Sequence, residues 1–255
     1  MDASRRHDVA LVRAGNPGPY TLEGTNGWVV GRGPCWIVDP GPLLDEHVAA
    51  LLAVARERGG AAGVALTHGH ADHAQAARAV ADGAGGVPVA AMHPALADVV
   101  LGDGDRLGPL EAVHVPGHAP DHLAFVTAAG ACFAGDAVLG RGSVLVTADL
   151  AAYLAALRGL RARGLDAIFP GHGPVVEDAD ARLEEYVSHR LAREAALLAA
   201  LRDGLRDADE LLDRVWADAP AALRAGAART LAAHLDKLAA EGRLPEGVRY
   251  PSTVR

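Results

Sequence analysis

The 255-residue sequence is poor in several features that mark common protein classes. It has two cysteines, Cys35 and Cys132, which are too few for a disulfide framework and form no CxxC metal pair. Both lie in apolar strand-like stretches, so we expect two buried free thiols rather than a disulfide. No stretch approaches 18 consecutive apolar residues, and the first residues lack the apolar core of a signal peptide. We therefore expect a cytoplasmic protein without a membrane span.

Positive charge and aromatic rings are also scarce. The formal net charge is −8, and Phe, Trp and Tyr together make up 4% of the residues. Residues 180–255 are close to neutral, with 12 Lys or Arg and 13 Asp or Glu. A nucleic-acid-binding surface normally needs Lys or Arg along a groove and aromatic platforms for the bases. The composition therefore disfavours a polyanionic partner, although it is compatible with a local basic patch.

Short β-branched runs alternate with helical patterns through the first two-thirds of the sequence. The expected strands are residues 8–12, 26–31, 35–39, 64–67, 87–92, 112–116, 122–127, 131–134 and 166–170. The expected helices between them are residues 43–58, 72–81 and 149–163. This mixture predicts a layered α/β domain.

The strand signal ends near residue 178. Helical patterns then cover residues 180–203, 207–217 and 220–242, with Pro220 and Gly242 as the boundaries of the last one. We divide the chain into an α/β catalytic domain, residues 1–178, and a C-terminal all-helical domain, residues 179–255. The first of these helices is expected to bury one apolar stripe. Its residues are Leu183, Tyr186, Val187, Leu191, Leu197, Leu198 and Leu201.

The strongest local signal is the segment Leu66–His73, between a strand-like run and a helical one. Three imidazoles and one carboxylate fall within six residues of it: His68, His70, Asp72 and His73. These side-chain types bind zinc and other first-row metals. One metal with an open position needs only three protein ligands. Four ligands in one segment therefore indicate two metals and further ligands elsewhere.

Three more segments place a histidine or an aspartate after an apolar run and beside a glycine. They contain His118, Asp136 and His172. Glycine lets the backbone turn sharply, so that a ligand can enter a cleft. A lone His-x-His pair would be weak evidence, but four such segments in this order predict a metal site.

The pattern resembles that of the metallo-β-lactamase superfamily, a His-x-His-x-Asp-His box followed by a His, an Asp and a His at strand ends. The resemblance covers residues 20–175 or so and implies a four-layer αβ/βα sandwich, with the site along one edge of its two sheets. It implies a ligand set for two metals: His68, His70 and His118 for the first, Asp72, His73 and His172 for the second, and Asp136 between them.

The resemblance also implies a mechanism. Two divalent ions, with zinc the best fit and iron or manganese the alternatives, would share a hydroxide that attacks a carbonyl or a phosphorus. Asp72 and Asp136 would offset part of the charge of the pair. Antibiotic-degrading enzymes of this fold usually carry Cys or Ser at other ligand positions, and flavodiiron proteins carry Glu at the position of His70 and have a flavin domain. Neither activity is expected here.

Three further residues are expected near the site. Asp39 ends a strand where the family often has a carboxylate that supports a ligand, with a turn-forming role as the alternative. His122 matches a family position that supports the ligands or touches substrate, with a plain structural histidine as the alternative. Asp121 is expected to orient a ligand histidine.

A narrower resemblance is to the β-lactamase-like-protein-2 branch. Three segments carry it: residues 16–26 at the entry, 186–194 at the start of a C-terminal helical domain, and 234–243 as the last helix of a winged-helix fold. The branch commonly continues with Thr-Tyr where this chain has Gly27 and Trp28. Its members include a single-strand-specific endoribonuclease and thioesterases that release polyketides from carrier proteins.

Three functions compete on this basis. The first is hydrolysis of thioesters or related activated esters, on a small-molecule or carrier-bound substrate, with the C-terminal domain restricting access. The second is an endoribonuclease acting on single-stranded RNA. The third is a non-catalytic regulator that binds DNA, which the intact ligand set disfavours because buried charged ligands without metals would be destabilising. The acidic balance favours the first.

Overall fold

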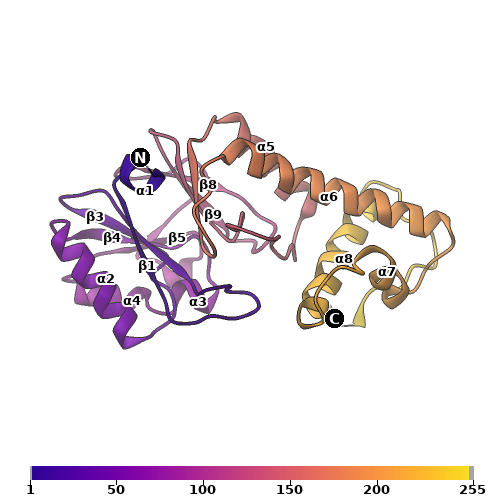
Figure 1. The fold of residues 1–255 in the computed structure, drawn as a ribbon, viewed down its shortest axis with the longest axis horizontal. Helices are drawn as coiled ribbons and strands as arrows, with labels where there is room; N and C mark the ends of the chain where they lie inside the picture. Colours follow the sequence, from indigo (N-terminus) through magenta and orange to yellow (C-terminus); the bar gives the residue numbers. More distant parts are fainter. Residues whose placement is uncertain (1, 253–255) are drawn as a thin grey trace.

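The computed structural model describes residues 2–252, and it shows two sheets covered by helices on both outer faces (Figure 1). The first sheet has the strand order β1-β2-β3-β4-β5-β6. Its strands are β1 (Val9–Arg13), β2 (Asn26–Val30), β3 (Cys35–Val38), β4 (Ala61–Ala65), β5 (Val89–Ala91) and β6 (Val99–Val100). Pairs β1–β2 and β2–β3 are antiparallel, and the following pairs are parallel.

The second sheet has the order β11-β10-β9-β8-β7. Its strands are β7 (Arg106–Leu107), β8 (Leu110–His114), β9 (Leu123–Thr127), β10 (Ala131–Gly135) and β11 (Ala167–Pro170). Only β10 and β11 pair in parallel, and the helix α5 (Leu150–Ala162) lies between them in sequence. The crossover leaves the ends of β10 and β11 side by side, which positions the residues that follow them.

Alternation along the strands explains the layers. In β2, Trp28 and Val30 belong to the core between the sheets, whereas Val29 faces the opposite way. The outer face of the first sheet packs against α2 (Asp45–Glu57), the short α3 (Ala71–Ala74) and α4 (Ala77–Gly83). The outer face of the second sheet packs against α5 and the first half of α6 (Ala179–Arg202). The predicted four-layer sandwich is therefore present.

Most predicted elements appear, with three differences. The helix expected over residues 72–81 is two helices, α3 and α4, separated at Gln75 and Ala76. The two-residue strands β6 and β7, and the short helix α1 (Ala3–Arg6), have too few residues to show a periodic pattern. Both cysteines are free and buried, as expected. Within residues 2–252, none of the helices is both long and apolar enough to cross a bilayer.

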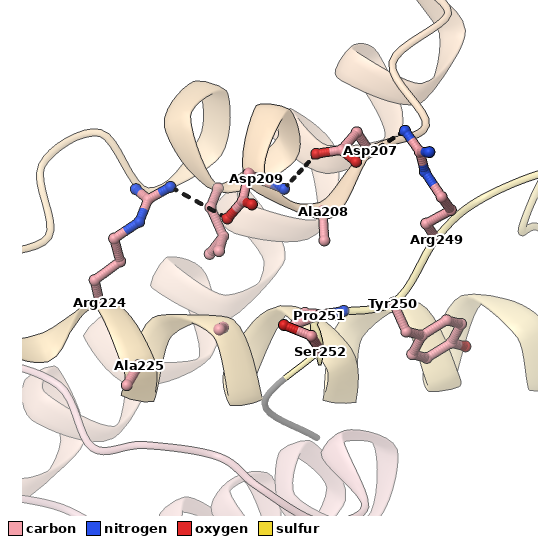
Figure 2. A pocket seen from close by; sticks show the side chains of 11 residues that line it. Asp207, Ala208, Asp209, Arg224, Ala225, Arg249, Tyr250, Pro251 and Ser252 are labelled. Carbon is pink, nitrogen blue, oxygen red and sulfur yellow. Dashed lines mark hydrogen bonds and ion pairs between the residues drawn. The ribbon is translucent and has the colours of Figure 1, made fainter. Parts of the chain in front are cut away.

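The C-terminal helices have an apolar core of their own. The second half of α6 packs with α7 (Ala208–Val215) and α8 (Arg224–Ala240) through Leu197, Leu211, Leu231 and Leu235. The expected start of the last helix at Pro220 is wrong, because Pro220 precedes a short 3₁₀ turn and α8 begins at Arg224. A cavity of about 430 Å³ lies between α7 and α8, and Figure 2 shows ion pairs at its edges.

The apolar stripe predicted on α6 is partly wrong. Leu191 is 41% exposed, whereas Arg190 and Glu194 are buried on the face that turns inward. Glu194 is paired with Lys237 at 2.7 Å and with Arg243 at 2.8 Å. The helix passes from one core to the other at this point (Figure 1), so polar contacts replace apolar packing.

His234 of α8 is a buried titratable group without a polar partner. Its ring lies 5.7 Å from that of Trp216, and neither ring nitrogen has a hydrogen-bond partner within the described residues. Burial, together with the cations Arg190 and Lys237, lowers the pKa of His234 to about 3. The folded chain therefore keeps this imidazole neutral in mild acid.

Replacement of His234 by leucine should reduce the acid sensitivity of the fold. Below a pH of about 6.5, the pKa of a free imidazole, the unfolded chain takes up a proton on His234 while the folded chain does not. The free energy of unfolding therefore falls as the pH drops from about 6.5 towards 3. Between pH 7 and pH 5 the wild type should lose roughly 2 kcal/mol from this group, and H234L should lack that part. Urea unfolding at both pH values measures this difference. An equal loss in both proteins would contradict the expectation.

Candidate metal centre

The four ligand-bearing segments predicted from the sequence meet at one edge of the two sheets. The first follows β4 and runs into α3, and the others follow β8, β10 and β11. Most of the side chains lie at the end of a strand or in the loop directly after it, and Asp72 and His73 lie in the short helix α3. The structure brings all seven predicted ligand residues together, in three overlapping groups.

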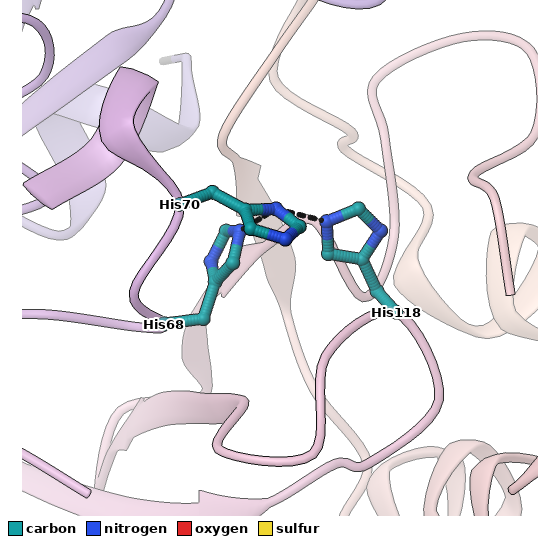
Figure 3. Close-up of side chains that lie close together, drawn as sticks. All are labelled: His68, His70 and His118. Atoms are coloured by element: carbon teal, nitrogen blue, oxygen red, sulfur yellow. Dashed lines mark hydrogen bonds between the residues drawn. The ribbon is translucent and has the colours of Figure 1, made fainter. Parts of the chain in front are cut away.

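The first group contains His68, His70 and His118 (Figure 3). The Nδ1 atom of His70 lies 3.0 Å from Nε2 of His68 and 2.9 Å from Nε2 of His118. Three imidazole nitrogens thus point at one position. Three nitrogen donors with room for a fourth ligand form a typical catalytic zinc site.

The second group contains Asp72, His73 and His172. The Nε2 atoms of His73 and His172 are 3.2 Å apart, and Oδ2 of Asp72 lies 3.3 Å from Nε2 of His172. Two nitrogens and one oxygen therefore converge on a second position. His73 and Asp72 can face it because they lie in the first turn of α3.

Asp136 lies between the two groups. Its Oδ1 is 3.4 Å from Nε2 of both His73 and His172, and its Oδ2 is 3.6 Å from Nε2 of His118. Oδ1 is buried and accepts no hydrogen bond from any residue between 2 and 252. A buried carboxylate oxygen without a donor needs a cation nearby. The donor set fits two divalent ions joined by this carboxylate.

Comparison with known proteins identifies the family to which the chain belongs. Residues 208–246 match the model of the β-lactamase-associated winged helix domain. The β-lactamase-like protein 2 homolog of Caenorhabditis elegans is 30% identical over 251 residues, covering 92% of this chain and 85% of the relative. The chain belongs to the metallo-β-lactamase superfamily.

Further relatives agree with this assignment. An atrochrysone carboxyl ACP thioesterase from Aspergillus chevalieri is 36% identical over 216 residues, which cover 76% of this chain and 66% of that protein. The chain thus spans just under two thirds of that relative. A metallo-β-lactamase family protein from Thermus thermophilus has a TM-score of 0.74 at 26% identity, covering 92% of this chain and 94% of its own. The protein TTHA1623, solved in a di-iron-bound form, has a TM-score of 0.55 at 30% identity, covering 68% and 98%.

The comparisons confirm the predicted superfamily, branch and fold class. The protein is a hydrolase of the metallo-β-lactamase fold with a C-terminal winged-helix domain. The residues that match the winged-helix model lie within the predicted C-terminal domain, although the boundary at residue 178 itself stays a prediction.

Asp39 forms hydrogen bonds to two residues of this metallo-β-lactamase centre, Thr67 and His73. Its carboxylate accepts hydrogen bonds from the backbone N–H of Thr67 at 2.8 Å, from the Thr67 hydroxyl at 2.7 Å and from Nδ1 of His73 at 2.9 Å. With a metal bound, the last bond would keep the proton of His73 on Nδ1 and leave the Nε2 lone pair for the second position.

Other ligands are oriented in the same way. The hydroxyl of Thr67 donates to Asp39, so it accepts from Nδ1 of His68 at 3.0 Å. Nδ1 of His118 donates to the carbonyl of Leu145 at 3.1 Å. Neither Thr67 nor the Leu145 carbonyl was predicted from the sequence as a support of a ligand. Thr67 could have been found beside His68, whereas a backbone carbonyl leaves no signal in a sequence.

His122 lies behind two of the predicted ligand residues. It is fully buried, its ring stacks on that of His68 with the centroids 4.9 Å apart, and its Nε2 accepts the backbone N–H of Asp136 at 3.1 Å. These contacts favour a role in supporting the ligands, which stays a prediction. Gly135, with φ +47°, allows this approach, because a Cβ there would lie 2.9 Å from Nε2 of His122.

The expected role of Asp121 stays a prediction. Within the described chain, no hydrogen bond joins Asp121 to a ligand histidine. Its Oδ2 lies near Gly69, where a Cβ would be 3.2 Å away.

The electrostatics also favour cations in this centre. Burial disfavours charge on His73 and His172, but nearby carboxylates outweigh it. Asp136 and Asp39 raise the pKa of His73 well above its usual value, and Asp136 and Asp72 raise that of His172 to about 9. Burial opposes ionisation of Asp136, yet these two imidazoles hold its pKa well below the usual range. Protons thus occupy the negative field when no metal does, and metal binding must displace them.

Replacement of Asp39 by asparagine should weaken metal binding while the fold persists. Asparagine keeps the shape but cannot serve as a charged acceptor for His73, so zinc affinity should fall by roughly 10–100-fold. Competition with a fluorescent chelator measures the affinity. Asp45, an exposed carboxylate in the first turn of α2, provides the control. Equal zinc affinities for D39N and D45N would show that Asp39 does not support the centre.

Proposed function

We propose that this chain is a dinuclear metal-dependent hydrolase that cleaves acyl thioesters or related activated esters. The observation that carries the proposal is the position of Asp136. Its two oxygens face two separate donor groups, one of three imidazoles and one of two imidazoles and a carboxylate. Such a set can hold two ions rather than one.

The residues have distinct tasks in this proposal. His68, His70 and His118 would hold the first ion, Asp72, His73 and His172 the second, and Asp136 both. Two bound divalent ions would lower the pKa of a bound water to about 7 and would stabilise negative charge that develops on a carbonyl oxygen. Asp72 and Asp136 offset part of the ionic charge. Imidazole and carboxylate donors suit zinc best, with iron or manganese as alternatives.

The thioester class is supported by a relative and by the charge of the C-terminal helices. The Aspergillus relative is named an acyl-carrier thioesterase and shares 36% identity with this chain. The basic side chains of the C-terminal helices are largely paired with carboxylates, and Figure 2 shows Arg224 with Asp209 and Arg249 with Asp207. Further pairs involve Arg193, Arg214, Lys237 and Arg243. Paired cations offer little to a phosphate backbone, which disfavours RNA and DNA as partners.

The metal-loaded protein should hydrolyse acyl thioesters faster than lactones and leave single-stranded RNA intact. A parallel assay of these three substrate classes at one enzyme concentration measures the ranking. An RNA preparation that is cleaved, with the cleavage abolished by a chelator, would favour the endoribonuclease instead. Binding to DNA without turnover of any substrate would favour the regulator.

Replacement of Asp136 by alanine should abolish most activity without unfolding the chain. Loss of the residue that spans both groups should lower kcat/KM by more than about 100-fold, since even residues behind the ligands typically matter by 10–100-fold. The metal content should fall from about two ions per chain, as measured by elemental analysis. His189 of α6 lies outside the centre, so H189A should keep both metals and nearly full activity. Equal losses in the two variants would mean that the site is misassigned.

A further inference from the structure

The loop of residues 140–149 lies between the metal centre and the C-terminal helices. It connects β10 to α5 and has no regular secondary structure of its own. On one side it contacts the segment that carries His118. The carbonyl of Leu145 accepts from Nδ1 of His118 at 3.1 Å, and the hydroxyl of Thr147 donates to the His118 carbonyl at 2.9 Å. The backbone N–H of Thr147 also donates to the carbonyl of Gly117 at 2.8 Å. The loop thus fixes both the ring and the backbone of this ligand.

On its other side the loop is held by α8. The backbone N–H of Val146 donates to the hydroxyl of Thr230 at 3.3 Å. One turn earlier in α8, Gly226 has no side chain, and a Cβ there would lie 2.6 Å from Cδ2 of Leu145. Leu145 therefore packs directly on the helix backbone. The residues on either side of the Leu145 carbonyl are held by this helix.

Arg190 of α6 holds the beginning of the same loop. Its side chain is almost fully buried, and it donates to the hydroxyl of Ser143 at 2.6 Å and to the carbonyl of Val144. No carboxylate within residues 2–252 forms an ion pair with it. Burying a guanidinium without a counter-charge costs free energy, so these loop oxygens are the acceptors that offset the cost.

The loop also shares apolar packing with the C-terminal helices. Val144 and Val146 are buried in the same cluster as Tyr186 of α6 and Ala233 of α8. The same cluster also contains side chains of the second sheet and α5, whereas the side-chain hydrogen bonds of residues 143–146 lead to α6 and α8 on one side and to His118 on the other. No strand or helix of their own fixes their position.

We infer that Thr230 and Arg190 are positioning residues for the metal ligand His118. Through the loop of residues 143–147, the C-terminal helices keep the Leu145 carbonyl where it orients the imidazole towards the first metal position. This inference rests on the proposed metal-binding role of His118. It gives the C-terminal domain a task in building the metal centre, in addition to any restriction of substrates.

Two matched pairs of variants test the inference in the full-length chain. T230V removes the hydroxyl that accepts from Val146, whereas T127V removes an equivalent acceptor for the N–H of Ala131, 3.1 Å away in the β9–β10 turn. G226A pushes against Leu145, whereas G159A adds the same methyl to α5 with no described atom within 4 Å. The first variant of each pair disturbs the loop, and the second serves as its control.

T230V and G226A should each bind zinc at the His118 group about three- to tenfold more weakly, less than the loss of a direct partner would cause. Competition of zinc against a fluorescent chelator measures this affinity without substrate. At subsaturating zinc the kcat of these variants should fall while KM stays constant. T230S, which keeps a hydroxyl, should restore both the zinc affinity and the kcat. T127V and G159A should match the wild type.

The outcomes separate this inference from the proposed function. A wild type that binds fewer than two zinc ions would refute the dinuclear proposal itself. A wild type that binds two, with wild-type zinc affinity in both T230V and G226A, would refute only the positioning role. Equal losses in the variants and their controls would also overturn it, because they would reflect general destabilisation. If T230V does not fold, the G226A–G159A pair decides the question alone.

Discussion

The structure depends on the negative charge of Asp136 at a place where five imidazoles and a second carboxylate converge. A buried carboxylate with an oxygen that lacks a donor is costly unless a cation compensates it. Protons do so in part, as the raised pKa values of His73 and His172 show. Divalent ions do so better, because they attract every converging lone pair at once. The surrounding hydrogen bonds orient the imidazoles so that their free nitrogens face the two metal positions.

The fold provides the rigidity that this charge arrangement requires. His68, Asp136 and His172 follow strands whose last residues are buried on both faces, so the backbone there cannot shift without disturbing a core. The parallel pairing of β10 and β11 places the segments of Asp136 and His172 side by side. Asp39, at the end of β3, adds a connection between the first sheet and α3 through His73. The centre therefore forms where both sheets end, and neither sheet could build it alone.

Most elements, and the side chains that meet at the strand ends, could be predicted from the sequence, because hydrophobic period and side-chain type are local properties. It was insufficient wherever a partner distant in the chain decides the role. Asp121 and His122 are neighbours in sequence, but only the fold shows that one lies against Gly69 and the other behind Asp136. The predicted apolar stripe on α6 was partly wrong for the same reason. Arg190 is buried because loop oxygens from residues 143 and 144 meet it, and no periodicity in α6 encodes those oxygens.

The loop at Leu145 changes how the two domains should be regarded. All seven ligands precede residue 178, so a division by ligand position makes the C-terminal helices an accessory. The hydrogen bonds indicate that the C-terminal helices also support the metal centre, since the acceptor for His118 lies in a loop held by α6 and α8. A ligand whose orientation drifts loses affinity steeply, because a metal–nitrogen bond tolerates little misalignment. An event that moves α8, such as docking of a bulky carrier-bound acyl group, would then change the metal affinity at the first position. On this inference, domain contact and metal affinity would be coupled through the carbonyl oxygen of Leu145.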